Sequence, residues 1–409
     1  LFQAVLVTIL RMLDKTVEEL KDGCFPRGSQ IRHLQISHSS LREISEGAFV
    51  NLKDSLESLA LVSSRLSHVP QKSLADLRNL NSLSNLDLAE NKLKMFPMAP
   101  LRRLDILASL RLLAEDCFRS CPILHTLSLY YNSIETIHKD AFVSLKDLEE
   151  LYLAENNILE IPGDAFIGSV SLAVVYLQQN AIRRIDGKGL TSLTQLAQLY
   201  LSNNYIEKVP REFLEHCENL SSLSLDGNKI RELQPGTFLK LHQLRELRLQ
   251  DNHIIEVKRG VFSPLPSLLE LHLQNNAITD METGALRTLN SLQHVNLQGN
   301  QLTVLGDVFQ LSTSESSSGG SSLAPLFRDL LLVERLYLTN NSISRIEDGA
   351  FQPMQALKFL ELSMNKLRAE FALERRMWKA TRVENRQVIL KHRRKERMQQ
   401  REKQRFLLM

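Results

Sequence analysis

Apolar and polar residues recur along this chain in a fixed order that returns every 24 residues. The stretch LYLAENNI, from Leu151 to Ile158, comes back as VYLQQNAI from Val175 and as LYLSNNYI from Leu199. Apolar and polar positions alternate at the start of each copy, which is the period of a strand with one buried face. Because one such unit cannot bury its leucines alone, the pattern predicts parallel strands stacked side by side.

An asparagine follows each predicted strand, where the chain must turn out of the sheet. Its side-chain amide can satisfy backbone groups that the turn leaves unpaired. Ser39 and Ser64 occupy the same position in two upstream copies, where a hydroxyl can do so only partly. The aligned asparagines are Asn91, Asn132, Asn156, Asn180, Asn204, Asn228, Asn252, Asn276, Asn300, Asn341 and Asn365.

A phenylalanine recurs on the return segment, ten residues after five of these asparagines. Such a column is expected to stack as a buried spine that packs against the leucines. Phe213 lies nine residues after Asn204, one residue early, whereas Phe49 lies ten residues after Ser39. The other members are Phe142, Phe166, Phe238, Phe262 and Phe351.

The segment LEELYLAENNILEIPGDAFIGS, residues 148–169, matches the pattern LxxLxLxxNxIxxIxxxAFxxL almost letter for letter. In this it resembles the extracellular class of leucine-rich repeat proteins, over residues 31–367 and about 14 repeats, with a shortened copy at 104–110. The resemblance implies an α/β solenoid. This would be a horseshoe with a concave parallel sheet and an irregular or short helical convex side.

Three departures from the repeat define the domain organisation. Residues 1–30 are interpreted as a capping segment or a partial repeat, although their apolar start also has features of a secretion signal. The Ser/Gly-rich run near 311–325 is expected to be a surface insertion, with a processing or partner site as the alternative. Residues 368–409 form a basic tail, expected to be helical or disordered.

The net charge of +3 is divided unevenly. Residues 368–409 contain fourteen Lys or Arg against five acidic residues, a net +9, so that residues 1–367 carry −6. A basic arm can bind nucleic acid or an acidic membrane. Because the tail has no recognisable binding module, a solvated tail is the preferred interpretation and no nucleic-acid partner is predicted.

Chemical motifs do not point to an enzyme or to a cofactor. The chain has no GxSxG, no phosphate-binding glycine loop and no HExxH. His272 and His294 lie on neighbouring predicted strands, but without a third ligand they are interpreted as polar surface, and no metal site is predicted. Cys117 and Cys121 either form a disulfide or fill the repeat core as small apolar residues.

The outward positions of the predicted strands are where the repeats differ from one another. Tyr152, Tyr176 and Tyr200 occupy the same outward position in three consecutive copies. Tyr and Arg anchor many protein interfaces, although tyrosine also stabilises strands without any partner. The predicted partner-binding residues are Tyr130, Tyr152, Tyr176, Tyr200, Arg248, His272 and Tyr337, with Tyr131 beside Tyr130 and with Glu150, Gln198, Glu246 and Glu270 in a second outward column.

The predicted function is non-catalytic protein recognition through the concave face, outside the cell or at its surface. Asn219 and Asn340 begin N-x-S triplets that could carry glycans there. The segments at 31–49 and 56–70 are most similar to chaoptin-like insect adhesion proteins, which implies homophilic or heterophilic adhesion and a lipid anchor. No anchor signal is seen in this sequence. The alternatives are a Toll-type receptor ectodomain and an intracellular scaffold.

Overall fold

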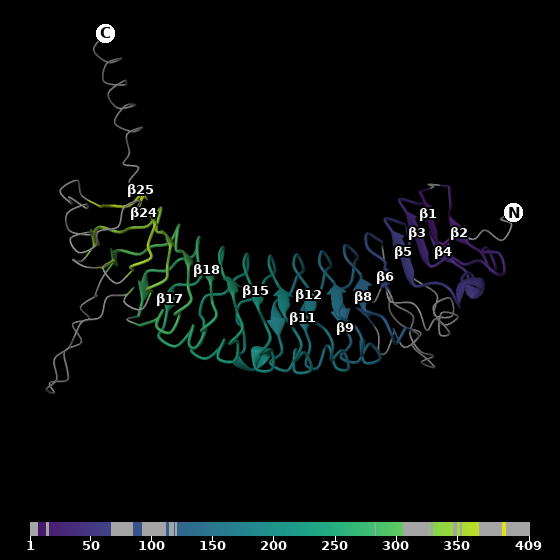
Figure 1. The fold of residues 1–409 in the computed structure, drawn as a ribbon, viewed down its shortest axis with the longest axis horizontal. Coiled ribbons are helices and arrows are strands. Elements are labelled where there is room, and N and C mark those ends of the chain that lie inside the picture. Colours follow the sequence, from purple (N-terminus) through teal and green to yellow (C-terminus); the bar gives the residue numbers. More distant parts are fainter. Residues whose placement is uncertain are drawn as a thin grey trace, which may run out of the picture. The chain divides into compact units, whose positions relative to one another are not determined.

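A computed structural model describes most of the repeat region. The described residues are 7–13, 16–66, 85–91, 112–113, 118, 121–282, 284–305, 327, 330–346, 350–351, 354–367 and 387–389. The chain divides into two compact units, Leu1–Lys229 (unit 1) and Ile230–Met409 (unit 2). Each unit is a parallel β-solenoid in which one short strand per turn lies beside the strand of the next turn (Figure 1).

The main sheet of unit 1 is parallel throughout. Its strands are β1 (Ile9–Met12), β3 (His33–Ser37), β5 (Ser58–Val62), β6 (Asn85–Asp87), β8 (Thr126–Ser128), β10 (Glu150–Tyr152), β12 (Val174–Tyr176), β14 (Gln198–Tyr200) and β15 (Ser222–Ser224). The register places Leu151, Val175 and Leu199 opposite one another, and none of the three is exposed. Burying each such side chain contributes roughly 1.5–3 kcal/mol, which stabilises the stack.

Two longer spacings leave the register of the sheets intact. In unit 1, β6 lies directly beside β8, with Leu86 opposite Leu127. The shortened copy predicted at 104–110 lies outside the described residues. In unit 2, Val295 lies opposite Leu336, so β20 and β22 are direct neighbours despite the longer spacing. The Ser/Gly-rich segment between them in the sequence also lies outside the described residues.

The main sheet of unit 2 consists of β16 (Glu246–Arg248), β18 (Glu270–His272), β20 (His294–Asn296), β22 (Arg335–Tyr337), β24 (Phe359–Glu361) and β25 (Gln387–Ile389). Strand β25 belongs to the basic segment 368–409. It pairs in parallel with β24, with Val388 opposite Leu360. The expectation of a helical tail is therefore wrong at residues 387–389, which extend a sheet edge as a strand. The rest of that segment lies outside the described residues.

After the asparagine turn, the chain forms further two-residue strands that the sequence did not predict. In unit 1 these are β2 (Glu19–Leu20) with β4 (Glu43–Ile44), β7 (Leu112–Leu113) with β9 (Thr136–Ile137), and β11 (Glu160–Ile161) with β13 (Arg184–Ile185). In unit 2 they are β17 (Glu256–Val257) with β19 (Asp280–Met281), and β21 (Val304–Leu305) with β23 (Arg345–Ile346).

The conformation of the return segments changes the fold class from the expected α/β to β. In the described part of the chain, the only helices are short 3-10 helices, η1 (Val50–Leu52) and η3 (Arg211–Leu214), and there is no α-helix. Residues with left-handed backbone interrupt the return segments, as at Gly168 with φ of +93°. A Cβ at Gly168 would lie 2.3 Å from the carbonyl oxygen of Val143, so only glycine fits between these turns. The fold is a parallel β-solenoid.

The asparagines satisfy backbone groups at the turns, as predicted, and also form a ladder of hydrogen bonds between neighbouring turns. Asn156 Nδ2 donates to the carbonyl oxygens of Leu129 at 2.9 Å and Leu153 at 3.1 Å, while its Oδ1 accepts the N–H of Ile134 at 3.0 Å. Asn180 repeats this arrangement one turn later. The serines at the same position bond less: Ser39 Oγ lies 2.9 Å from Ser64 Oγ and accepts one N–H at 3.3 Å. The sequence-based interpretation of both residue types is confirmed.

The phenylalanines form the predicted buried spine on the return side. Phe142 stacks on Phe166 with ring centroids 5.8 Å apart, and Phe238 stacks on Phe262 at 6.1 Å. All predicted members are at most 2% exposed. Three phenylalanines that the sequence analysis did not include extend the stacks: Phe25, Phe118 and Phe327.

Candidate functional site

The most ordered feature of unit 1 outside its core is a stack of three tyrosines on the sheet face. We define the sheet face as the surface formed by the first and third residues of the main-sheet strands, which point away from the leucines. The register places Tyr152, Tyr176 and Tyr200 directly opposite one another. Their ring centroids are 4.5 and 4.8 Å apart, with interplanar angles of 11° and 4°. The three rings are half-buried, and their remaining surface faces solvent.

Hydrogen bonds to the second outward column fix two of these rings. Tyr152 donates its hydroxyl to Glu150 at 2.7 Å, and Tyr200 donates to Gln198 at 2.9 Å. Burial and then the hydrogen bond to Glu150 raise the pKa of Tyr152, and burial is also the main cause of the raised pKa of Tyr176. Tyr152 and Tyr176 are therefore neutral at physiological pH, and the stack presents rigid rings of defined orientation.

Tyr130 and Tyr131 lie at the turn after β8 rather than in the stack. Tyr130 donates its hydroxyl to Glu155 at 2.6 Å, and this hydrogen bond is the main cause that raises the pKa of Tyr130 to about 12. The rings of Tyr130 and Tyr131 are 6.2 Å apart, and Tyr131 is 57% exposed. The structure thus places this pair next to the turn of the following repeat.

The other predicted partner-binding residues belong to unit 2. Arg248 is bound to Glu246 through two nitrogens, each 2.6 Å from Oε1. Asn296 separates His272 from Tyr337 in the outward column. Tyr337 packs against Phe359, with ring centroids 5.1 Å apart. The unit 2 residues therefore form no aromatic stack like that of unit 1.

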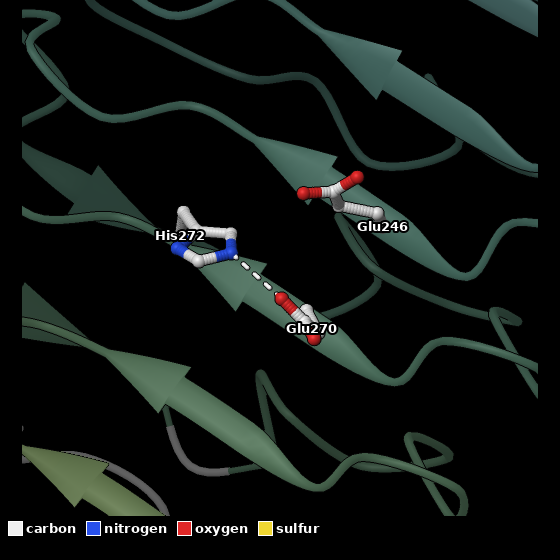
Figure 2. A group of neighbouring side chains, drawn as sticks. All are labelled: Glu246, Glu270 and His272. Atoms are coloured by element: carbon white, nitrogen blue, oxygen red, sulfur yellow. Dashed lines mark hydrogen bonds and ion pairs between the residues drawn. The ribbon is translucent and has the colours of Figure 1, made fainter.

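A polar cluster on the sheet face of unit 2 was only half visible in the sequence. Figure 2 shows His272 and Glu270, both on β18, turned toward one another beside Glu246 on β16. His272 Nε2 lies 3.3 Å from Glu270 Oε2, and His294 Nδ1 lies 3.4 Å from Glu270 Oε1. The sequence placed the two histidines on neighbouring strands and Glu246 and Glu270 in the second outward column, but the position of a carboxylate between the histidines was not predicted. The signal was the glutamate that begins two consecutive strands, in ELR and ELH.

The glycosylation triplets and cysteines are placed as follows. Asn219 and Asn340 are both exposed, and Asn219 Nδ2 donates to the carbonyl oxygen of Thr194 at 2.9 Å. Cys121 and Cys217 are buried free thiols whose pKa burial raises to about 12. This agrees with Cys121 as a core residue, whereas Cys117 lies outside the described residues.

Two repeat-family models match the sequence. The model described as Leucine rich repeat matches residues 109–158, 147–206, 194–254, 243–302 and 325–367. The model described as BspA type Leucine rich repeat region (6 copies) matches residues 6–125. Neither describes a catalytic family. Comparison with curated proteins found no match.

Solved structures with the same fold include receptors and bacterial proteins. A chain of the TLR13–ssRNA13 complex is 26% identical, with a TM-score of 0.63 over 83% of this chain and 47% of that chain. A chain of the Drosophila Toll–Spatzle complex is 22% identical, with a TM-score of 0.60 over 82% and 44%. An LRR protein of Leptospira interrogans is 20% identical, with a TM-score of 0.60 over 94% and 96%. The present chain therefore spans about half the length of the two receptor-complex chains.

Within the described residues, no helix has both the length and the apolar character needed to cross a bilayer.

Proposed function

Because the chain belongs to the leucine-rich repeat family, we propose that it is a non-catalytic scaffold that binds a protein partner on the sheet face of unit 1. The tyrosine stack, Tyr152 with Tyr176 and Tyr200, carries this proposal. Tyrosine combines a large apolar ring with a polar tip and has few side-chain torsions to immobilise, so it contributes strongly to binding at a low entropy cost. Stacking holds the rings in place before a partner arrives, which lowers that cost further.

A purely structural role for the tyrosines is the competing explanation. Cross-strand aromatic pairs stabilise a sheet by roughly 0.2–1 kcal/mol each, so the two pairs account for at most about 2 kcal/mol. That stabilisation does not require the three rings to be the same residue type. Three adjacent tyrosines leave a continuous band of aromatic surface facing solvent, and such surface favours association with a partner.

The surroundings of the stack suggest what the partner offers. Glu150 accepts a hydrogen bond from Tyr152 in the stack, and Glu155 accepts one from Tyr130 at the turn after β8. A surface that combines aromatic rings with carboxylates is complementary to apolar side chains flanked by Lys or Arg. We therefore expect a partner with a basic-apolar patch.

Within this function, cell-surface adhesion is the role that we favour, in an extracellular domain. The repeat pattern and the similarity of residues 31–49 and 56–70 to chaoptin-like proteins support this choice. A second candidate is the ectodomain of a Toll-type receptor. The 26% identity to a chain of the TLR13–ssRNA13 complex favours that candidate, although the match covers only 47% of that chain.

Replacing Tyr152, Tyr176 and Tyr200 together by Ser tests the proposal in cells that display the full chain. Hot-spot residues cost at least about 2 kcal/mol each when truncated, and 1.4 kcal/mol is tenfold in affinity. We therefore expect cell aggregation, or binding of the purified chain to partner cells, to weaken by at least about 100-fold.

The matched control is Tyr205→Ser, which removes a 42% exposed tyrosine that lies outside the tyrosine stack. This variant should leave aggregation and binding unchanged. Circular dichroism and thermal melting establish whether the triple variant folds, and replacement of the same three residues by Phe keeps the rings if it does not. Unchanged binding by the folded triple-Ser variant would refute the proposal.

A further inference from the structure

Four side chains with metal-binding chemistry converge on the sheet face of unit 2. Glu246 comes from β16, Glu270 and His272 from β18, and His294 from β20. In the register of the sheet, Glu246, Glu270 and His294 are direct neighbours across three consecutive strands, and His272 lies two residues beyond Glu270. All four occupy outward positions. The parallel register alone brings them together.

The distances between the donor atoms are close to those around a metal ion. One donor atom from each of Glu246, Glu270 and His272 can be chosen so that all three lie within 4.8 Å of one another. Zinc binds nitrogen and carboxylate oxygen at about 2.0–2.2 Å, which places tetrahedral ligands roughly 3.3–3.5 Å apart. The 3.3 Å separation between His272 Nε2 and Glu270 Oε2 already has this value. Binding of the ion by Glu246 requires its carboxylate to move closer to the other two donors than the 4.8 Å limit within which the three donor atoms now lie.

The residue types select among the cations. Imidazole nitrogen suits zinc and related transition metals, whereas calcium and magnesium prefer sites built from oxygen alone. In open zinc sites, three protein ligands bind the ion and the fourth coordination position is left for another donor. In such sites the second oxygen of a ligating carboxylate is also typically hydrogen-bonded to a neighbouring group. Here His294 contacts the second oxygen of Glu270 at 3.4 Å.

Arg248 is the main competitor of the ion for the carboxylate of Glu246. Its guanidinium contacts Glu246 Oε1 at 2.6 Å, and its side chain is 47% exposed. A carboxylate has two oxygens and about four acceptor positions, so that Glu246 can bind an ion and keep part of its contact with Arg248. The positive charge of Arg248 still disfavours a second cation nearby.

We propose that Glu246, Glu270 and His272 bind one zinc ion on the sheet face of unit 2, with His294 positioning Glu270. The fourth coordination position faces outward, where water or a side chain of a partner can take it. This site is independent of the tyrosine stack, because it lies in the other unit and uses different residues.

Zinc titration of the full chain by isothermal calorimetry tests the site, with buffered zinc as the only ligand. The native chain should bind one more zinc ion, in the micromolar range, than the His272→Ala variant does. The matched control is His253→Ala, which removes an exposed histidine outside the cluster and should leave the stoichiometry unchanged. Calcium and magnesium should not compete. Circular dichroism checks that each variant is folded.

Two further variants separate a zinc site from a set of ion pairs. Loss of a residue that hydrogen-bonds a metal ligand typically weakens metal binding 10–100-fold. His294→Ala should therefore weaken zinc binding by this factor. His294→Gln can still donate to Glu270 and should restore part of the affinity. Arg248→Gln should strengthen zinc binding, because it removes the competing charge. Equal zinc stoichiometry in the native chain and His272→Ala, saturation only at millimolar zinc, or full competition by calcium would each overturn the proposal.

Discussion

Asn156 shows how one residue type connects neighbouring turns of the solenoid. Its amide hydrogens reach carbonyl oxygens of its own turn and of the preceding turn, and its carbonyl accepts an N–H of the preceding turn. Asn156 is 8% exposed, so water cannot replace these bonds. A serine is too short to span the same distance, which explains why Ser39 bonds mainly to Ser64. The recurrence of asparagine at this repeat position is thus explained by hydrogen bonding between turns.

Replacement of Asn156 by Ala should lower the free energy of unfolding of unit 1 by about 2–5 kcal/mol. The reason is that several buried backbone groups lose their partner at once. The control is Asn157→Ala, because the side chain of the next residue is exposed. Urea denaturation followed by circular dichroism measures both variants. Equal stability of the two would contradict a structural role for the ladder.

At the scale of the element, each turn combines a strand of fixed register with a return segment, and many of these return segments contribute a buried phenylalanine. Phe166 stacks between the turns, with its centroid 5.8 Å from that of Phe142, and is 1% exposed. The next residue, Ile167, is 39% exposed on the same return segment. Because neighbouring turns are stabilised mainly by each other, loss of one ring affects more than the turn that carries it.

For this reason Phe166→Ala should destabilise unit 1 by about 3–5 kcal/mol, whereas Ile167→Ala should cost less than about 1 kcal/mol. Differential scanning calorimetry of the two variants makes the comparison directly, since both change adjacent apolar residues. A similar loss for both would mean that the phenylalanine column is not the continuous core that its stacking indicates.

At the scale of the whole molecule, the two proposed sites lie on separate units and can be changed independently. The tyrosine stack belongs to unit 1, and the Glu/His cluster belongs to unit 2. Substitutions in one site should leave the other intact, because distant changes are generally additive. The glycosylation triplets divide in the same way, with Asn219 in unit 1 and Asn340 in unit 2.

An extracellular role predicts glycans on the exposed residues Asn219 and Asn340 in protein isolated from its native cells. Mass spectrometry before and after enzymatic removal of N-glycans measures occupancy at each site. Asn219→Gln and Asn340→Gln should each abolish the modification at the substituted position only. Unmodified asparagines at both positions would favour the intracellular scaffold over the two extracellular candidates.

The sequence by itself determined the solenoid and its main parallel sheet, because each turn repeats the same local pattern, whereas the β conformation of the return segments was not predicted. Alternating leucines define the buried face of the strand, the asparagine defines the turn, and the phenylalanine defines the return. These leucine, asparagine and phenylalanine positions can be identified within each turn separately. The same pattern places Tyr152, Tyr176 and Tyr200 in one outward column, and the register of the sheet confirms this.

Only the tertiary structure determined which side chains of neighbouring turns contact each other. Residues 24 apart become direct neighbours, and the identity and rotamers of their side chains determine whether they pair. Glu270 bridges His272 and His294 through contacts that involve two strands, and no single turn contains that information. Strand β25 at Gln387–Ile389 is similar, because pairing with an open sheet edge replaced the local preference of a charged segment for helix.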